Sequence, residues 1–164
     1  MEIREEPALV LSCEHASRAV PARYRALFAG SEGVLSTHRA YDAGALRLAR
    51  ALARAFRAPL HVGRVTRLLV DLNRSPGHPE VCSEFSAGLR PKARAALLRT
   101  YHRPYRSAVE AEVRRALGRH RVVVHLALHS FTPYWRGRAR RVDLGLLGDP
   151  SRGPERALAR RFRA

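Results

Sequence analysis

Residues 8–15 read ALVLSCEH, an apolar run that ends in two polar residues. The apolar residues are continuous up to Ser12 rather than alternating with polar ones, which is typical of a strand buried on both faces of a parallel sheet. Pro7 precedes the run, and the polar pair Glu14 and His15 ends it. We therefore predict a fully buried strand over residues 8–13, with His15 in the loop that leaves it.

Apolar patterns along the rest of the chain predict further strands alternating with helices. Continuous or β-branched apolar runs indicate strands, and apolar residues at helical spacing opposite arginines indicate helices. Prolines can restart helices at residues 91 and 104. The further predicted strands are 60–65, 68–72, 122–128 and 142–147. The predicted helices run from Asp42 to before Pro59, over 91–101, over 104–117 and over 155–164, with a short helical turn within 20–28.

Helices that alternate with buried strands indicate an α/β domain of three layers. A crossover helix makes the strands that it joins parallel to one another. With 164 residues, 46% of them hydrophobic, the chain has enough apolar material for one core. We expect a single domain over residues 1–164.

Composition bears on partners and on location. The formal charge is +17, which raises nucleic acid as a partner, but the arginines lie among alanine and leucine in every predicted helix, so charge alone does not favour it. The chain lacks an apolar run of membrane-spanning length, and residues 1–6 are acidic, unlike a signal peptide. We expect a cytoplasmic protein without membrane contact. Cys13 and Cys82 lack the spacing of a disulfide framework or a cysteine zinc site.

Two histidines stand directly after predicted strands. His15 follows residues 8–13 and His129 follows residues 122–128. Because the carboxyl ends of parallel strands meet at one edge of a sheet, both imidazoles are expected there, and Asp42 at a helix start can face the same edge. Two histidines and one carboxylate, with a position open for water, make up the usual catalytic zinc site.

Each of these residues also has a simpler interpretation. Asp42 is a candidate helix N-cap. His129 could be a histidine at a strand end that forms a hydrogen bond to the backbone and binds no metal. His38, four residues before Asp42, is either a competing ligand or a partner that orients a ligand, if the helix starts early. Glu14 is either a carboxylate that activates water or a solvated residue.

Four separated motifs, in one order, resemble the N-formylglutamate amidohydrolase family. They are residues 12–17 (SCEHAS) with Pro21, residues 38–45 (HRAYDAGA), residues 66–75 (TRLLVDLNRS), and residues 125–133 with 143–147 (DLGLL). The resemblance extends from about Leu9 to about Asp149. It implies a fold similar to the zinc carboxypeptidases and the zinc-dependent muramoyl amidases, an αβα arrangement with a mixed, largely parallel sheet.

The resemblance also implies roles for named residues. His15, Asp42 and His129 would hold Zn²⁺, and Arg67, Asn73 and Arg74 would grip a substrate carboxylate, where a guanidinium can form two parallel hydrogen bonds. The implied substrate is a small N-acyl amino acid, with a formyl-type amide on an acidic residue such as glutamate.

The implied mechanism also requires a general base. In the family it is a glutamate of a C-terminal segment, and this chain is expected to be short at that end. Glu14 is the candidate for that catalytic role within the chain.

Two other interpretations stay open. One is a basic α/β module that binds nucleic acid or another polyanion, which requires arginines gathered on one face. The other is a truncated relative that binds metal without catalysing a reaction. Oligomeric state is not predicted.

Overall fold

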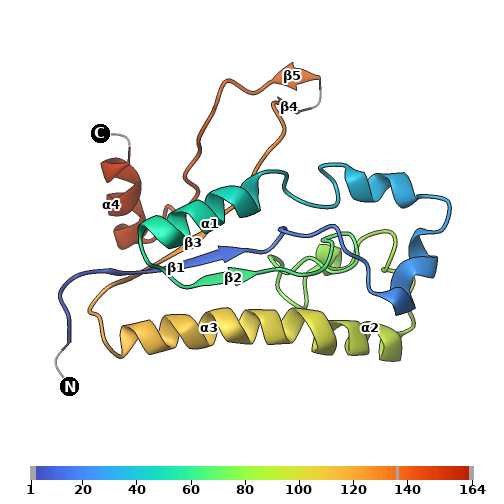
Figure 1. Cartoon of the computed structure of the whole chain (residues 1–164), viewed down its shortest axis with the longest axis horizontal. Coiled ribbons are helices and arrows are strands. Elements are labelled where there is room, and N and C mark those ends of the chain that lie inside the picture. Colours follow the sequence, from blue (N-terminus) through green and yellow to red (C-terminus); the bar gives the residue numbers. More distant parts are fainter. Residues whose placement is uncertain (1–2, 136, 163–164) are drawn as a thin grey trace. The chain divides into compact units, whose positions relative to one another are not determined.

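The computed structural model describes residues 3–135 and 137–162. They form two compact units, Met1–Phe131 and Thr132–Ala164. In the first unit, a parallel three-stranded sheet is flanked by helices, so the predicted three-layer α/β fold is confirmed (Figure 1). The strands are β1 (Ala8–Cys13), β2 (Leu60–Val62) and β3 (Val123–Ala127), in the order β2-β1-β3. The sheet itself is parallel throughout its described strands rather than mixed.

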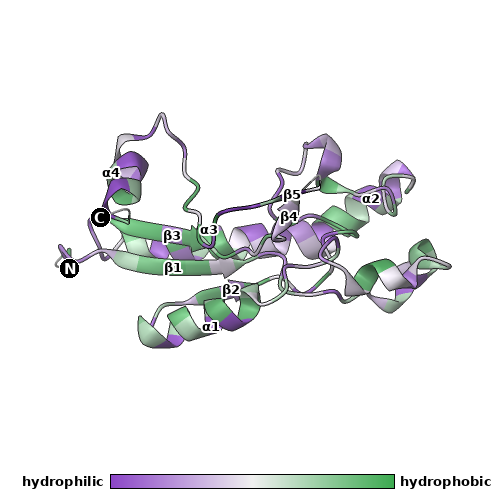
Figure 2. Cartoon of the chain, turned by 90° about the horizontal axis from the view of Figure 1, so that it is seen from above, coloured by the Kyte–Doolittle hydropathy of each residue, from purple (hydrophilic) through white to green (hydrophobic). Residues whose placement is uncertain are grey.

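Strand β1 lies in the centre of the sheet, which accounts for the burial that its continuous apolar pattern predicts. It pairs with β2 on one side and with β3 on the other, and Val10, Leu11 and Cys13 are fully buried. The hydropathy colouring shows the apolar character of β1 and β3 (Figure 2). β3 lies at an edge of the described sheet and is only partly buried, in contrast to the prediction of a fully buried run.

The order of the strands places a topological switch point at one edge of the sheet. Helix α1 (Ala45–Ala55) connects β1 to β2, and helix α3 (Arg103–Leu117) precedes β3. The chain moves outward from β1 to β2 and then back across β1 to β3, so right-handed connections place the two helices on opposite faces. Figure 1 shows α1 and α3 on opposite sides of the sheet. The loops leaving β1 and β3 therefore flank a topological switch point, where open α/β sheets bind ligands.

Residues 68–72, predicted as a strand, form turns instead. The apolar pattern correctly indicated burial, because Leu68, Leu69 and Val70 lie in the largest hydrophobic cluster. Thr66 explains the turn: its hydroxyl donates to the Ala40 carbonyl and accepts from the Leu68 amide. A hydroxyl that binds nearby backbone in this way competes with strand pairing.

The helices begin and end close to their predicted limits, with two differences. α1 begins three residues after Asp42, behind Gly44, whose φ of 82° lies in the left-handed region open to glycine. The helix α2 (Pro91–Leu97) continues through a π turn (Leu98–His102) into α3, so Pro104 does not start a separate helix. The remaining helical turns of this unit are 3₁₀, over Ala22–Phe28, Glu32–Ser36 and Pro79–Val81.

The second unit contains a hairpin and one helix. β4 (Tyr134–Trp135) and β5 (Arg138–Ala139) pair antiparallel, and α4 (Gly153–Arg161) confirms the predicted C-terminal helix up to the last described residues. The predicted strand over 142–147 is wrong, because no described residue pairs with it. Leu144 and Leu147 are largely exposed. An apolar run predicts a strand only where another segment offers it a hydrogen-bonding edge.

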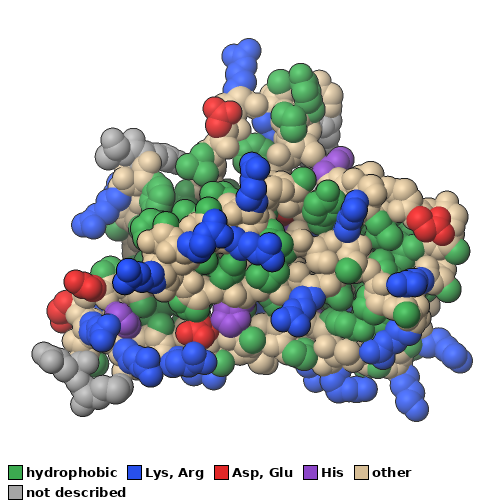
Figure 3. All heavy atoms as spheres, viewed as in Figure 1, with side chains coloured by type: hydrophobic (Ala, Val, Ile, Leu, Met, Phe, Trp, Pro, Cys, Tyr) green, Lys and Arg blue, Asp and Glu red, His purple; other side chains and the backbone are tan. Residues whose placement is uncertain are grey.

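Basic side chains occur across the viewed face, separated by hydrophobic and other side chains (Figure 3). The outer face of α1 carries exposed arginines and no acidic residue. These are Arg47, Arg50 and Arg54. No helix among the described residues is long and apolar enough to cross a membrane.

Candidate metal centre

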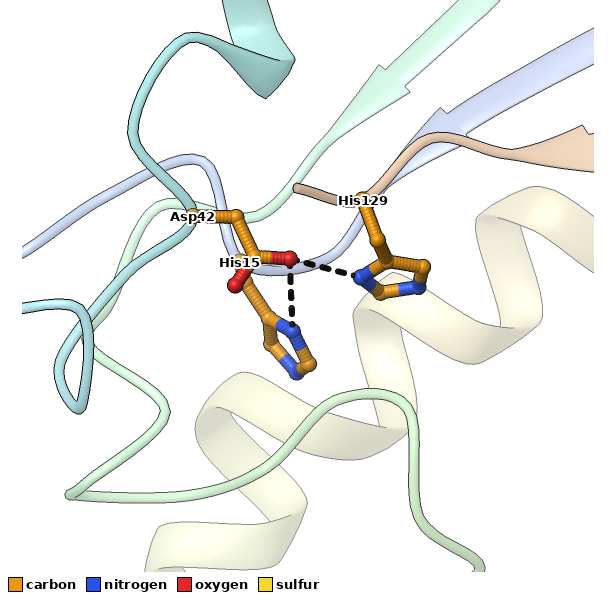
Figure 4. A group of neighbouring side chains, drawn as sticks. All are labelled: His15, Asp42 and His129. Atoms are coloured by element: carbon orange, nitrogen blue, oxygen red, sulfur yellow. Dashed lines mark hydrogen bonds and ion pairs between the residues drawn. The ribbon is translucent and has the colours of Figure 1, made fainter. Parts of the chain in front are cut away.

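Three residues that are far apart in the sequence converge at the switch point. His15 follows β1, His129 follows β3, and Asp42 lies just before α1. Each offers one ligand atom, and the three atoms lie within 4.8 Å of one another. Figure 4 shows both imidazoles turning one nitrogen toward the same Asp42 oxygen.

Asp42 is the centre of this group. Its Oδ2 lies 2.8 Å from His129 Nδ1 and 3.4 Å from His15 Nδ1. The backbone amide of Asp42 donates to the His15 carbonyl, which ties the two loops together. The N-cap interpretation of Asp42 is wrong, because Gly44 holds that position and Asp42 directs its carboxylate toward the histidines.

Asp71 holds the other nitrogen of His15, a contact that the sequence analysis did not identify. Asp71 Oδ1 lies 2.7 Å from His15 Nε2 and also accepts the Asn73 amide. A carboxylate on Nε2 retains the proton there and leaves the Nδ1 lone pair for a metal. The signal for Asp71 was an acidic residue inside the apolar run 68–72, since a carboxylate in such a run is buried only when paired.

Burial and opposite charges set the protonation of this group in the absence of metal. Burial by itself lowers the pKa of His15, but contacts with Asp42 and Asp71 outweigh it and raise that pKa above the ordinary 6.5. Burial likewise opposes ionisation of Asp42 and Asp71, yet the neighbouring histidines bring both carboxyl pKa values below 3.8. Both carboxylates are therefore charged at neutral pH.

Cys13 sits beside the group but is not equipped to join it. Burial, together with the negative charges of Glu14 and Asp42, raises the pKa of the Cys13 thiol to about 12. A metal ligand must be a thiolate, so the protonated Cys13 acts as a small buried side chain.

Glu14 is buried next to His129. Its Oε1 accepts a hydrogen bond of 3.1 Å from the Tyr105 hydroxyl, and its Oε2 lies 3.5 Å from His129 Nε2. The interpretation of Glu14 as a solvated residue is wrong, because it is 3% exposed. Sequence reasoning missed Tyr105, whose only signal was its place one helical turn before the apolar Val109.

The predicted substrate-binding residues lie at the rim of the same group. Arg67 contacts Asp42 Oδ1 at 3.5 Å and Asp71 Oδ2 at 3.3 Å. Arg74 lies 3.9 Å from Asp71 and 3.2 Å from Glu80, and its side chain is 42% exposed. The Asn73 side chain is exposed, and its backbone amide is the part that binds Asp71.

His38, the competing ligand, is exposed and is not a member of the three-residue group. The other histidines bind elsewhere. His125 contacts Ser12, His102 contacts the Arg74 carbonyl, His120 contacts the Glu6 carbonyl, His61 lies near Glu112, and His78 caps a 3₁₀ turn.

Comparison with known proteins supports the resemblance read from the motifs. The family described as N-formylglutamate amidohydrolase matches residues 7–164. The chain belongs to this family. Its fold is similar to the crystal structure of gene product Atu2144 from Agrobacterium tumefaciens, with a TM-score of 0.71 and 36% sequence identity over 84% of this chain. The chain spans 57% of that protein's length. No curated protein matches the chain.

The donor set of this family member fits a zinc ion. Among the described residues, His15 Nδ1 is buried and has no hydrogen-bond partner, and it faces Asp42 Oδ2. Two imidazole nitrogens and one carboxylate oxygen are ligands that zinc accepts in catalytic sites. A cation bound between the three ligand atoms would also give His15 Nδ1 the partner that it lacks.

Proposed function

We propose that this protein is a zinc-dependent amidohydrolase that removes an N-acyl group, of the formyl type, from an acidic amino acid such as glutamate. The observation that carries the proposal is the convergence of His15, Asp42 and His129 at the switch point of the sheet. Family membership supports the amide as the bond that is cleaved.

His15 Nδ1, His129 Nδ1 and one Asp42 oxygen would hold the ion. When bound, zinc polarises the scissile carbonyl and lowers the pKa of a coordinated water to about 7. His129 is the most open of the three residues, with 32% of its side chain exposed, so substrate would approach from its side of the group.

The arginines give the site its preference for an acidic substrate. Arg67 bridges Asp42 and Asp71 with two different nitrogens, so its guanidinium is held at the rim of the group. Arg74 is partly exposed. We assign Arg67 and Arg74, with Asn73, to the substrate carboxylates, because a fixed guanidinium pairs with a carboxylate through two parallel hydrogen bonds.

Hydrolysis also requires a group that accepts a proton from water. Glu14 is the predicted candidate, and its burial next to His129 is compatible with two roles, proton transfer or orientation of the imidazole.

The test is hydrolysis of N-formylglutamate by the purified chain, followed as released formate, with zinc added, removed by chelator and restored. The proposal expects activity that follows zinc and a stoichiometric ion that is lost in both His15→Ala and His129→Ala. His38→Ala is the matched control and is expected to retain zinc. A zinc-loaded chain that leaves N-formylglutamate intact would overturn the proposed reaction.

The alternative to an enzyme is a basic protein that binds nucleic acid or another polyanion. The exposed arginines of α1 are the feature that favours it. Any protein this basic will retain DNA at low salt, so only a preference for sequence or structure would support it.

A further inference from the structure

The carboxylate of Glu14 is held between Tyr105 and His129, on the side of the imidazole away from Asp42. We propose that Glu14 and Tyr105 are positioning residues: Tyr105 holds Glu14, and Glu14 holds the Nε2 proton of His129 so that Nδ1 faces the ion. This inference rests on the zinc site of the proposed function and concerns residues that act through His129.

The two oxygens of Glu14 face different groups. Tyr105 donates to Oε1 at 3.1 Å, and Oε2 lies 3.5 Å from His129 Nε2. Glu14 Oε2 is fully buried and, among the described residues, has no hydrogen-bond partner. A buried carboxylate oxygen without a donor is costly, so a proton on His129 Nε2 would satisfy it.

The chemistry of imidazole supplies that proton. A neutral histidine that binds metal through Nδ1 carries its proton on Nε2. In the metal-free arrangement, His129 Nδ1 faces Asp42 at 2.8 Å, so Nε2 is the nitrogen left to face Glu14. A carboxylate on this nitrogen fixes the tautomer, orients the ring and raises the basicity of the ligand.

His15 shows the same arrangement. Its Nδ1 faces Asp42, and its Nε2 contacts Asp71 at 2.7 Å. Asp71 is itself held by the Asn73 amide, just as Glu14 is held by the Tyr105 hydroxyl. Both histidines thus have a carboxylate on Nε2, and each of these carboxylates has a donor of its own.

The position of Glu14 also argues against a role in proton transfer. Glu14 Oε2 is fully buried and faces Nε2, whereas Nδ1 is the nitrogen that would bind the ion, so the imidazole ring lies between this carboxylate and the ion. A general base must lie within hydrogen-bond reach of the proton that it removes.

Tyr105 is well placed to fix Glu14. It projects from the first turn of α3, and its hydroxyl also lies 3.4 Å from the carbonyl of His61 in β2. The hydroxyl therefore connects α3 with the end of β1 and with β2.

The experiment compares zinc affinity, measured by competition with a chromophoric chelator, with kcat and KM for N-formylglutamate. The variants are Glu14→Ala, Glu14→Gln and Tyr105→Phe. Two matched controls lie on the same helical segment: Tyr101→Phe, whose hydroxyl binds Arg23, and Glu110→Ala, which pairs with Arg114. Thermal melting in chelator checks that each variant folds.

Glu14→Ala is expected to weaken zinc binding by roughly 10–100-fold. Glu14→Gln should recover part of this loss, because an amide oxygen still accepts the Nε2 proton, and Tyr105→Phe should weaken binding in the same direction by less. Both controls should bind zinc as the unchanged chain does.

Unchanged zinc affinity in folded Glu14→Ala would overturn the inference. So would Glu14→Gln with normal affinity and a kcat lower by about 10²–10⁴-fold, which is the signature of a general base. If the unchanged chain binds zinc without hydrolysing N-formylglutamate, the proposed reaction fails, while the affinity differences still test the positioning role. A chain that binds no zinc would overturn both.

Discussion

Among single residues, Asp71 is a buried carboxylate that several neighbours hold in place beside His15. It receives His15 Nε2, the Asn73 amide and the Arg67 guanidinium. We predict that Asp71→Ala weakens zinc binding by roughly 10–100-fold, because His15 loses the partner that fixes its tautomer and orientation. Zinc titration against a competing chelator measures this.

Asp143→Ala is the control for Asp71→Ala. Asp143 is exposed and lies in the unit Thr132–Ala164. Its variant should bind zinc with unchanged affinity. Equal affinities for both variants would show that Asp71 does not orient His15.

The metal-free protein should lose stability as the pH rises through the titration of His15. The folded-state pKa of His15 is raised above 6.5, so its contribution is fully present below pH 6.5 and is lost as the pH rises through the folded pKa. The pKa values of Asp42 and Asp71 are lowered below 3.8, so their contribution is present above pH 3.8 and is lost as the pH falls through their folded values. Urea unfolding in chelator should show this contribution as a greater loss of stability between about pH 5.5 and about pH 8 in the unchanged chain than in His15→Gln, because the desolvation that lowers the pKa of His125 acts in the opposite direction in both.

Two comparisons check the cause of this pH dependence. His15→Gln should reduce the difference, because glutamine does not titrate. Saturating zinc should reverse it, because the ion binds neutral imidazoles and competes with protons. A pH dependence that is identical in His15→Gln would exclude His15 as its source.

At the scale of elements, the ends of β1 and β2 approach closely enough to require a glycine. A Cβ at Gly63 would lie 1.9 Å from the Glu14 carbonyl oxygen, and the Gly63 amide donates to the Cys13 carbonyl. We predict that Gly63→Ala destabilises the protein by about 1–3 kcal/mol, because the backbone that carries Glu14 and His15 has to move. Urea unfolding measures the loss.

Gly33→Ala is the matched control, because a Cβ there meets no atom within 4 Å. Its effect should stay within about 0.5 kcal/mol. Gly63→Ala should also weaken zinc binding, since it displaces the loop that carries His15. Stability equal to that of Gly33→Ala would mean that the close approach of the two strands can relax without cost.

At the scale of the whole molecule, all groups of the proposed centre lie in the unit Met1–Phe131. The Leu128 amide donates to the Ser12 carbonyl, so the loop that carries His129 is tied to β1 within this unit. We predict that a fragment of residues 1–131 folds and binds zinc with the affinity of the full chain. Circular dichroism and zinc titration of the fragment measure this.

The control is the same fragment with His129→Ala, which should fold and lose the ion. A fragment that folds without binding zinc would show that the residues beyond Phe131 contribute to the site. An unfolded fragment would show that the two units depend on each other for stability.

The layers of the fold and the residues expected to meet at one edge of the sheet follow from local sequence pattern. The continuous apolar run of β1 required burial on both faces, which predicts a parallel sheet covered by helices. Histidines placed directly after two such strands had to reach the same edge, because parallel strands end together. These features can be predicted from local pattern, because an apolar run shows which residues are buried and the polar residues after it show where the strand ends.

The side chains that contact those ligands are brought to them by packing between distant segments. The run at 68–72 is as apolar as a strand but forms turns, because the Thr66 hydroxyl binds the distant Ala40 carbonyl. The run at 142–147 is apolar but has no strand partner among the described residues. Asp71 and Tyr105 reach His15 and Glu14 across 56 and 91 positions of sequence. Such contacts arise when elements pack, and residue spacing along the chain does not encode them.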